Sequence, residues 1–294
     1  MKVAQFGSAI AAGFIMLAVA PAAHAACSSS EAIQEPARRA RADTAVVARI
    51  LGEADQALAN RQFDDACVKY RLILSVDRNN EFARIGLGEG ALGETDFASA
   101  RTHFQAALNA NAANPVSHQG MGLAHLMAGD MAAADVELRA AVGADANLWR
   151  AWNGLGVISD SRSEWETADA AWAAAIAAAP TEASIYNNKG MSLMQRGSPA
   201  SAIPVFDEAL RLRPNLATAA SNRRIALAMT GAYDAALAGV SESDLPAALN
   251  NVAIAAARRG DTAVADRLLA AAVTASPRYY EVAERNRDLL RTSH

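Results

Sequence analysis

Four closely spaced glycines raise the question of phosphate binding. Residues 86–93 read GLGEGALG, and the stretch from Gly88 to Gly93 satisfies the pattern G-x-G-x-x-G. In dinucleotide-binding proteins this pattern follows a strand and opens a helix, so that backbone N–H groups face the anion. Here Gly88 belongs to a set of small residues that recur at fixed spacing inside helical segments. We therefore expect Gly88 to serve helix packing, and we expect no cofactor.

Histidine and cysteine offer little catalytic or metal-binding chemistry. His118 and His125 lie on one expected helix, at positions where other repeats hold core aromatics, and His103 stands alone on another. None of them has a third ligand at zinc-like spacing. The sequence also lacks a nucleophile elbow and a histidine-assisted cysteine. We therefore predict that the protein binds no metal and is not an enzyme.

A run of side-chain amides is the better candidate for a binding site. Asparagine is a poor helix former, yet it recurs in the middle of expected helices, and a side-chain amide both donates to and accepts from a peptide backbone. The alternative is that these amides are solvated or hold adjacent repeats together. Met191 and Met194 lie nearby by spacing and offer adaptable apolar contact. The predicted groove for a peptide or protein also comprises Asn153, Asn187, Asn188, Asn222, Asn250 and Asn251.

These residues belong to a repeat of 34 residues. Alanine recurs at this spacing, a bulky apolar residue follows each alanine by four positions, and a tiny residue precedes most of them by twelve. The pattern is typical of the tetratricopeptide repeat (TPR), a helix-turn-helix unit. The clearest copy is residues 149–182. The alanines are Ala66, Ala100, Ala134, Ala168, Ala202 and Ala236, the bulky residues are Tyr70, Phe104, Leu138, Trp172, Phe206 and Val240, and the tiny residues are Ala54, Gly88, Gly122, Gly156 and Gly190.

The predicted fold is all-α, a solenoid of stacked TPR units that form a right-handed superhelix with the first helix of each unit on its inner face. An alanine-rich composition with 5% aromatic residues favours helix over strand. We expect about seven repeats over residues 47–278, the sixth shortened after Val240, and a capping helix over residues 279–294. The expected repeats start near Val47, Glu81, Pro115, Trp149, Ala183, Ala217 and Pro246.

The charges of the inner face and of the whole chain indicate which kinds of partner to expect. The inner face lacks the lysines with which some TPR modules hold a terminal carboxylate, and the main inner-face charges of the fourth repeat, Arg150 and Asp160, are expected to be solvated. A formal charge of −4 and an isoelectric point near 5.8 give no electrostatic basis for nucleic-acid binding. We therefore expect a protein partner and no nucleic acid.

The amino terminus has the pattern of an export signal over residues 1–25. Lys2 supplies the charge, residues 10–20 are a short apolar core, and Ala23-His24-Ala25 is a small-residue cleavage site. Residues 26–46 lack an apolar face and are expected to form a flexible tether. No later stretch has about 20 uninterrupted apolar residues, so the mature chain is not expected to span a membrane.

Cys27 has two interpretations. The segment ACSSS is similar to the start of a mature bacterial lipoprotein, whose cysteine is lipidated, but His24 replaces the leucine-like residue usual in such signals. The other interpretation is cleavage after Ala25, which leaves Cys27 in a loose tail. Cys67, the other cysteine, could pair with Cys27 in an oxidising compartment, but we favour a buried, inert thiol.

A narrower resemblance covers the carboxy-terminal half. The segments YNNKGMSLMQRG, SNRRIALAMTGAYDAAL, LNNVAIAAARRGD and SPRYYEVAERNRDLL resemble the TadD family of tight-adherence (Flp) pilus assembly lipoproteins. The resemblance implies lipidation at Cys27, a periplasmic or outer-membrane location, and a role as an assembly or pilotin-like factor with a secretin or another pilus component as partner. The alternative function is a periplasmic TPR regulator that docks cell-wall hydrolases or other envelope enzymes.

Overall fold

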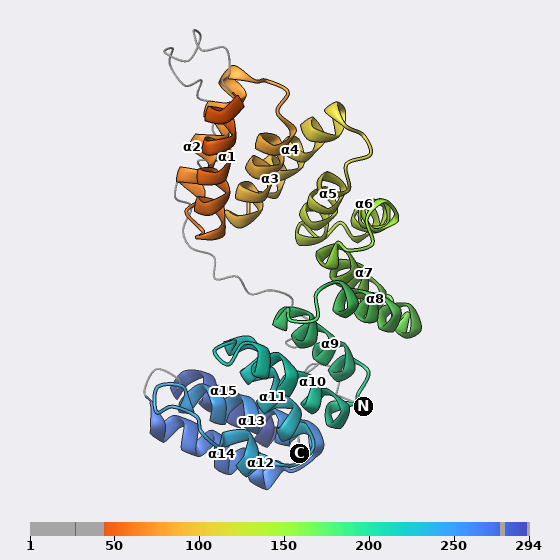
Figure 1. Ribbon diagram of the computed structural model, residues 1–294. Helices are drawn as coiled ribbons and strands as arrows, with labels where there is room; N and C mark the ends of the chain where they lie inside the picture. Colours follow the sequence, from red (N-terminus) through yellow and green to blue (C-terminus); the bar gives the residue numbers. More distant parts are fainter. Residues whose placement is uncertain (1–26, 28–43, 277–279, 293–294) are drawn as a thin grey trace. The chain divides into compact units, whose positions relative to one another are not determined.

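The computed structural model describes residue 27 and residues 44–276 and 280–292, and every regular element in this part of the chain is an α-helix (Figure 1). The predicted export signal and residues 28–43 of the predicted tether lie outside the described residues. The helices are α1 (Thr44–Ala59), α2 (Phe63–Val76), α3 (Glu81–Gly93), α4 (Phe97–Ala110), α5 (Pro115–Met127), α6 (Met131–Ala144), α7 (Trp149–Ser161), α8 (Trp165–Ala178), α9 (Ala183–Gln195), α10 (Pro199–Leu212), α11 (Ala217–Met229), α12 (Tyr233–Leu237), α13 (Leu245–Arg259), α14 (Thr262–Ala275) and α15 (Tyr280–Thr292).

The described helices fall into two compact units. Unit one holds Cys27 and α1–α8, and unit two holds α9–α15. Within each unit, successive helices pack in pairs, and the first helix of a pair also packs against the first helix of the next. This arrangement is a stack of TPR hairpins, so the predicted all-α solenoid of helix-turn-helix units is confirmed. We call the surface made by α1, α3, α5 and α7 the first-helix face of unit one.

The packing of glycine against a bulky side chain confirms the repeat register. A Cβ added at Gly88 would lie 2.7 Å from the ring of Phe104, and one at Gly156 would lie 2.7 Å from the indole of Trp172. The same relation joins Gly190 to Phe206. In each pair the bulky residue follows 16 positions later, on the second helix of the hairpin. The glycine is needed because a side chain there would push the two helices apart.

The turn inside the first six hairpins also repeats every 34 residues. One residue in each turn has a positive φ, the left-handed conformation that favours glycine. Thr95 has φ 63°, whereas Gly129, at the same place in the next repeat, has φ 87°. The full set is Arg61, Thr95, Gly129, Ser163, Gly197 and Gly231. The turn is therefore fixed by its place in the repeat, and a residue other than glycine occupies it at a cost in stability.

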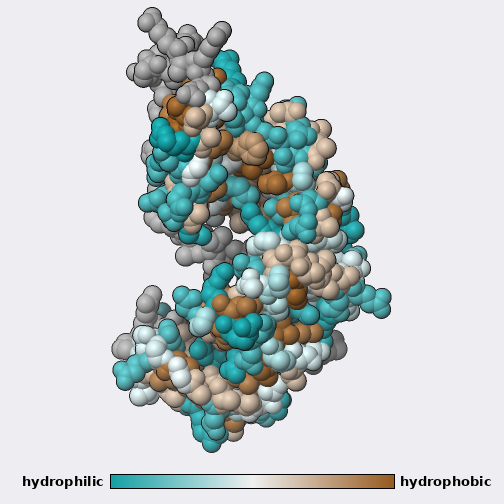
Figure 2. All heavy atoms as spheres, in the orientation of Figure 1, coloured by the Kyte–Doolittle hydropathy of each residue, from teal (hydrophilic) through white to brown (hydrophobic). Residues whose placement is uncertain are grey.

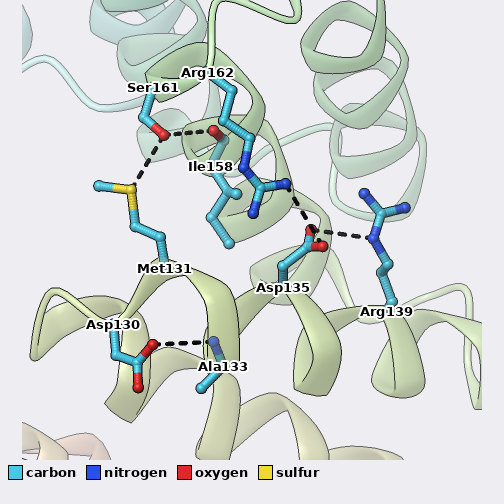
Figure 3. A network of polar contacts seen from close by, with 8 residues as sticks. All are labelled: Asp130, Met131, Ala133, Asp135, Arg139, Ile158, Ser161 and Arg162. Carbon is cyan, nitrogen blue, oxygen red and sulfur yellow. Dashed lines mark hydrogen bonds and ion pairs between the residues drawn. The ribbon is translucent and has the colours of Figure 1, made fainter.

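Polar contacts support these turns and join neighbouring hairpins. Asp130 caps α6 by accepting a hydrogen bond from the backbone N–H of Ala133 at 3.1 Å. Asp135 on α6 pairs with Arg139 at 3.1 Å and with Arg162 of the next hairpin at 3.6 Å (Figure 3). All of these side chains are at least partly exposed, so we expect each pair to contribute at most about 1 kcal/mol.

Unit two departs from the regular repeat at its sixth hairpin. Helix α12 spans only five residues, Arg224 stands where other repeats have glycine, and Val240 lies beyond the end of the helix. Helix α11 packs directly against α13, and their shared core includes Ala228 and Val252. Because the second helix ends before Val240, no large side chain packs opposite residue 224. Glycine is therefore not required at this position.

Helix α15 ends unit two. Its Ala283 and Leu290 are buried in a cluster with residues of α13 and α14. Arg287 of α15 donates to Asp266 of α14 through two nitrogens, at 2.6 and 3.0 Å. In the part of the chain that the structure describes, no helix is both long and apolar enough to cross a membrane.

Candidate protein-binding faces and the TPR class

The first-helix face of unit one carries exposed apolar surface. Phe82, in the first turn of α3, is 70% exposed, and Ile85 and Leu123 are partly buried beside the core. Figure 2 shows hydrophobic side chains gathered over α3 and toward α5. An aromatic ring left in water at this position costs free energy that a partner recovers by covering it. This face is therefore a candidate protein-binding surface.

An ion pair crosses the same face. Nη1 of Arg150 on α7 donates to both carboxylate oxygens of Glu89 on α3, at 2.9 and 3.0 Å. Because α3 and α7 both pack against α5, the pair joins two helices across the one between them. The expectation of a solvated side chain is wrong for Asp160, which is buried, whereas the side chain of Arg150 is ion-paired and stays 36% exposed. Spacing along the sequence does not show that charges two repeats apart can meet.

The predicted asparagine ladder is distributed over both units. Asn153 lies on α7 in unit one, whereas Asn187, Asn188, Asn222, Asn250 and Asn251 lie in unit two. The six amides therefore do not form one row within a single unit.

Within unit two, most of these amides bond to each other. Nδ2 of Asn222 on α11 donates to Oδ1 of Asn187 on α9 at 2.9 Å, and Nδ2 of Asn187 donates to Oδ1 of Asn188 at 3.2 Å. Asn250 is 7% exposed and accepts from Asn286 of α15 at 2.8 Å. These contacts match the alternative in which the amides hold adjacent repeats together. Ligand binding by the amides stays a prediction.

The two methionines of the predicted groove pack against the core. Met191 and Met194 on α9 are partly buried against a cluster that includes Phe206 and Ala226. They therefore fill space between hairpins, with only part of each side chain available to a partner.

The two cysteines form a disulfide. Cys27 is bonded to Cys67 of α2, and both are fully buried. The expectation of a buried, inert thiol at Cys67 is therefore wrong. In this structure the sulfur of Cys27, which a lipid would need, is bonded to another sulfur. The sequence held one relevant signal, two cysteines behind a predicted export leader, but their spacing could not show that they meet.

His118 and Trp152 make equivalent polar contacts in successive repeats. His118 lies within 2.6 Å of a carboxylate oxygen of Glu137 through Nδ1, and its Nε2 lies 3.0 Å from the carbonyl oxygen of Ala112. Trp152, at the same place in the next repeat, makes the corresponding bond to Ala146. Among residues 44–276 and 280–292 together with Cys27, no group of three His, Cys, Asp or Glu side chains is arranged to hold a metal ion.

The fold and its period define the class: this is a TPR protein. The family model for the tetratricopeptide repeat matches residues 183–216, the fifth repeat. No curated protein matches the chain.

Solved TPR structures share the fold at low sequence identity. PilW, described as a widely conserved type IV pilus biogenesis factor, is 18% identical with a TM-score of 0.59, over 69% of this chain and 93% of that one. PilF of Pseudomonas aeruginosa is 20% identical with a TM-score of 0.52, over 72% of this chain and 98% of that one. A chain of the APC/C hetero-tetramer Cut9–Hcn1 is 14% identical with a TM-score of 0.65, over 84% of this chain and 51% of that one. At these identities the likeness is one of fold.

Proposed function

We propose that the protein is a non-catalytic adaptor of the bacterial envelope that binds another protein and assists the assembly or localisation of a tight-adherence (Flp) pilus secretion complex. The observation that supports the binding role is the exposed Phe82 on the first-helix face of unit one, which also carries the partly buried Ile85 and Leu123. The fold presents this surface on packed helices, so little conformational entropy is lost when a partner docks.

The amino-terminal segment and the carboxy-terminal repeats indicate the kind of partner. The export signal over residues 1–25 directs the chain out of the cytoplasm, and the segments that resemble the TadD family indicate a secretin or another pilus-assembly component. Two solved proteins of the same fold, PilW and PilF, carry pilus names, and PilW is described as a pilus biogenesis factor. Their identity to this chain is too low to transfer a partner, so these names support the proposal only as context.

Site-specific photocrosslinking in the native envelope tests the proposal. A photoreactive amino acid replaces Phe82, and the captured proteins are identified by mass spectrometry. We expect a secretin or pilus-assembly component to be captured, because a partner that covers Phe82 brings its own side chains within crosslinking distance.

The matched control is Val136 on α6, a second helix. It is 67% exposed, close to the 70% of Phe82, but it lies outside the first-helix face. Equal capture from both positions would remove the assignment of this face. Capture of cell-wall hydrolases from Phe82 would replace pilus assembly with the alternative function, the docking of envelope enzymes.

A further inference from the structure

Cys27 is held in unit one by several contacts. Besides its disulfide to Cys67, its backbone N–H donates to Oε2 of Glu94 at 3.3 Å. Its carbonyl oxygen lies 3.1 Å from Nε2 of His103 on α4 and accepts a hydrogen bond from it. Cys27 is 1% exposed. Three separate contacts, to α2, to the residue that follows α3, and to α4, therefore hold one residue in place.

The protein provides space for this disulfide at Gly90. A Cβ added there would lie 2.6 Å from the sulfurs of both Cys27 and Cys67, closer than real Cβ contacts. Gly90 falls outside the repeated glycine position that Gly88 occupies, so the TPR register does not explain it. The disulfide supplies the reason, because any side chain at residue 90 would occupy the volume of the two sulfurs.

His103 fits the same site as a neutral donor. Burial lowers the pKa of His103, with a smaller contribution in the same direction from Arg71 and Arg84, while the hydrogen bond to Cys27 and the charge of Asp96 act the other way. A neutral imidazole with its proton on Nε2 donates to the carbonyl oxygen of Cys27. The hydrogen bond from His103 to Cys27 therefore requires that Cys27 packs against unit one.

We propose that Cys27 is a structural disulfide partner in the mature protein, that the export leader is removed after Ala25, and that the chain carries no lipid on Cys27. On oxidation the thiols of Cys27 and Cys67 lose two protons and two electrons, and the S–S bond forms. The electrons reduce the disulfide of a thiol oxidoreductase of the exported compartment to its dithiol. A thioether to lipid would use the same sulfur and would require this residue at the membrane surface instead of in the core.

Intact mass spectrometry tests the proposal on the full chain. The chain is expressed in bacteria with its own leader, and its free thiols are trapped with a thiol-blocking reagent before purification. We expect a chain that begins at Ala26, carries no acyl group and no blocking reagent, and partitions into the aqueous phase of a Triton X-114 separation. An acylated chain that begins at Cys27 would overturn the proposal. So would an unacylated chain with both thiols blocked.

Two cysteine variants, Cys67→Ala and Cys27→Ala, distinguish a disulfide partner from a lipidation site, and either one is informative if the other folds poorly. In Cys67→Ala, the thiol of Cys27 should become available to the blocking reagent after unfolding without any reductant, and the chain should stay unacylated. Cys27→Ala should still lose its leader after Ala25. A leader that is retained in Cys27→Ala, together with acylation in Cys67→Ala, would show that Cys27 is a lipidation site.

A pair of glycine substitutions separates the disulfide from general packing. Gly90→Ala should lower Tm and raise the fraction of reactive thiol in a glutathione buffer, because the added methyl group meets both sulfurs. Gly143→Ala is the control, since a Cβ at this helical glycine meets no atom within 4 Å. The loss of Tm at residue 90 should shrink in a Cys27→Ala, Cys67→Ala background. An equal loss in both backgrounds would mean that the disulfide does not set the need for glycine.

Discussion

The two units build the same hairpin with different regularity. In unit one, Gly88, Gly122 and Gly156 each receive a bulky side chain from the second helix of the same hairpin. In unit two, only Gly190 does so, while the sixth repeat has Arg224 in the slot and a second helix of five residues. Because each repeat packs mainly on its neighbours, a defect in one hairpin stays local. Glycine is therefore required only where a large side chain of the second helix packs opposite it.

The units also differ in the polar contacts between first helices. Among contacts between two side chains, unit one has the charged pair of Glu89 and Arg150. Unit two has the amide pairs of Asn187 with Asn222 and of Asn250 with Asn286 of α15. Both devices join helices of different repeats. They indicate that the first-helix surfaces are partly occupied by contacts within the protein, so a partner must compete with these contacts or bind beside them.

The largest expected effect tests the filled slot of unit one. Trp172→Ala should lower the free energy of unfolding by about 3 to 5 kcal/mol, because it empties a fully buried position. Val240→Ala, the corresponding change in unit two, should cost much less, because Val240 lies outside a helix and is only partly buried. Urea unfolding of both variants measures the difference. Equal losses would contradict the local packing described for the sixth hairpin.

The glycine of the same slot gives the next largest effect. Gly156→Leu should destabilise by about 1 to 3 kcal/mol through overpacking against Trp172. Arg224→Gly restores the consensus residue in unit two, yet it should destabilise by up to about 1 kcal/mol, because glycine is a poor helix former and no bulky side chain arrives to use the space. Thermal unfolding distinguishes the two cases. A stabilised Arg224→Gly variant would mean that the sixth slot is filled after all.

The amide pairs of unit two can be tested for structural and binding roles together. Asn222→Ala removes the donor to Asn187 and should cost about 0.5 to 1.5 kcal/mol of stability. Changing Asn187, Asn188, Asn222 and Asn251 together to Ala should also weaken partner binding if the ladder contacts a peptide. Titration calorimetry with the purified partner that crosslinking identifies measures the binding affinity. Wild-type affinity in the fourfold variant would leave the amides with a structural role alone.

The turns offer a smaller effect of opposite sign. Thr95 in unit one holds a positive φ, whereas the corresponding residues of unit two are glycines such as Gly197. Thr95→Gly should therefore stabilise by about 0.4 to 1 kcal/mol, because glycine adopts this conformation without strain. Gly197→Ala should destabilise by a similar amount, since no atom lies within 4 Å of the added Cβ and only backbone strain changes. Reversed signs would reject the strain at these turns.

The smallest effect concerns pH and is confined to unit one. The pKa of His103 is lowered in the folded state by burial, so below its ordinary value near 6.5 the unfolded chain binds the proton first. Stability from this group is therefore fully present above about pH 6.5 and is lost as pH falls toward the lower folded-state pKa. His103→Gln should flatten the pH dependence of stability in this window. An unchanged profile would exclude His103 as its source.

Much of the fold was predictable because the same pattern of residues occurs in successive repeats. The predicted starts at Glu81, Pro115, Trp149, Ala183 and Ala217 are the residues at which α3, α5, α7, α9 and α11 begin. The candidate sites were less predictable. The charge pair of Arg150, the amide pairs and the disulfide of Cys27 join residues far apart in the chain, and no local pattern encodes such a meeting.

The class of fold, the starts of five first helices and the residues that fill the regular hairpins follow from the amino-acid sequence, because helix periodicity and the 34-residue spacing act over short distances along the chain. The expected starts at Val47 and Pro246 differ from the observed starts of α1 at Thr44 and α13 at Leu245. Only the tertiary structure decided that the uninterrupted period divides into two units after Pro180, that the amides of unit two bond to each other, and that Cys27 is seated over Gly90. These features depend on which side chains meet across hairpins, and packing in three dimensions sets those distances.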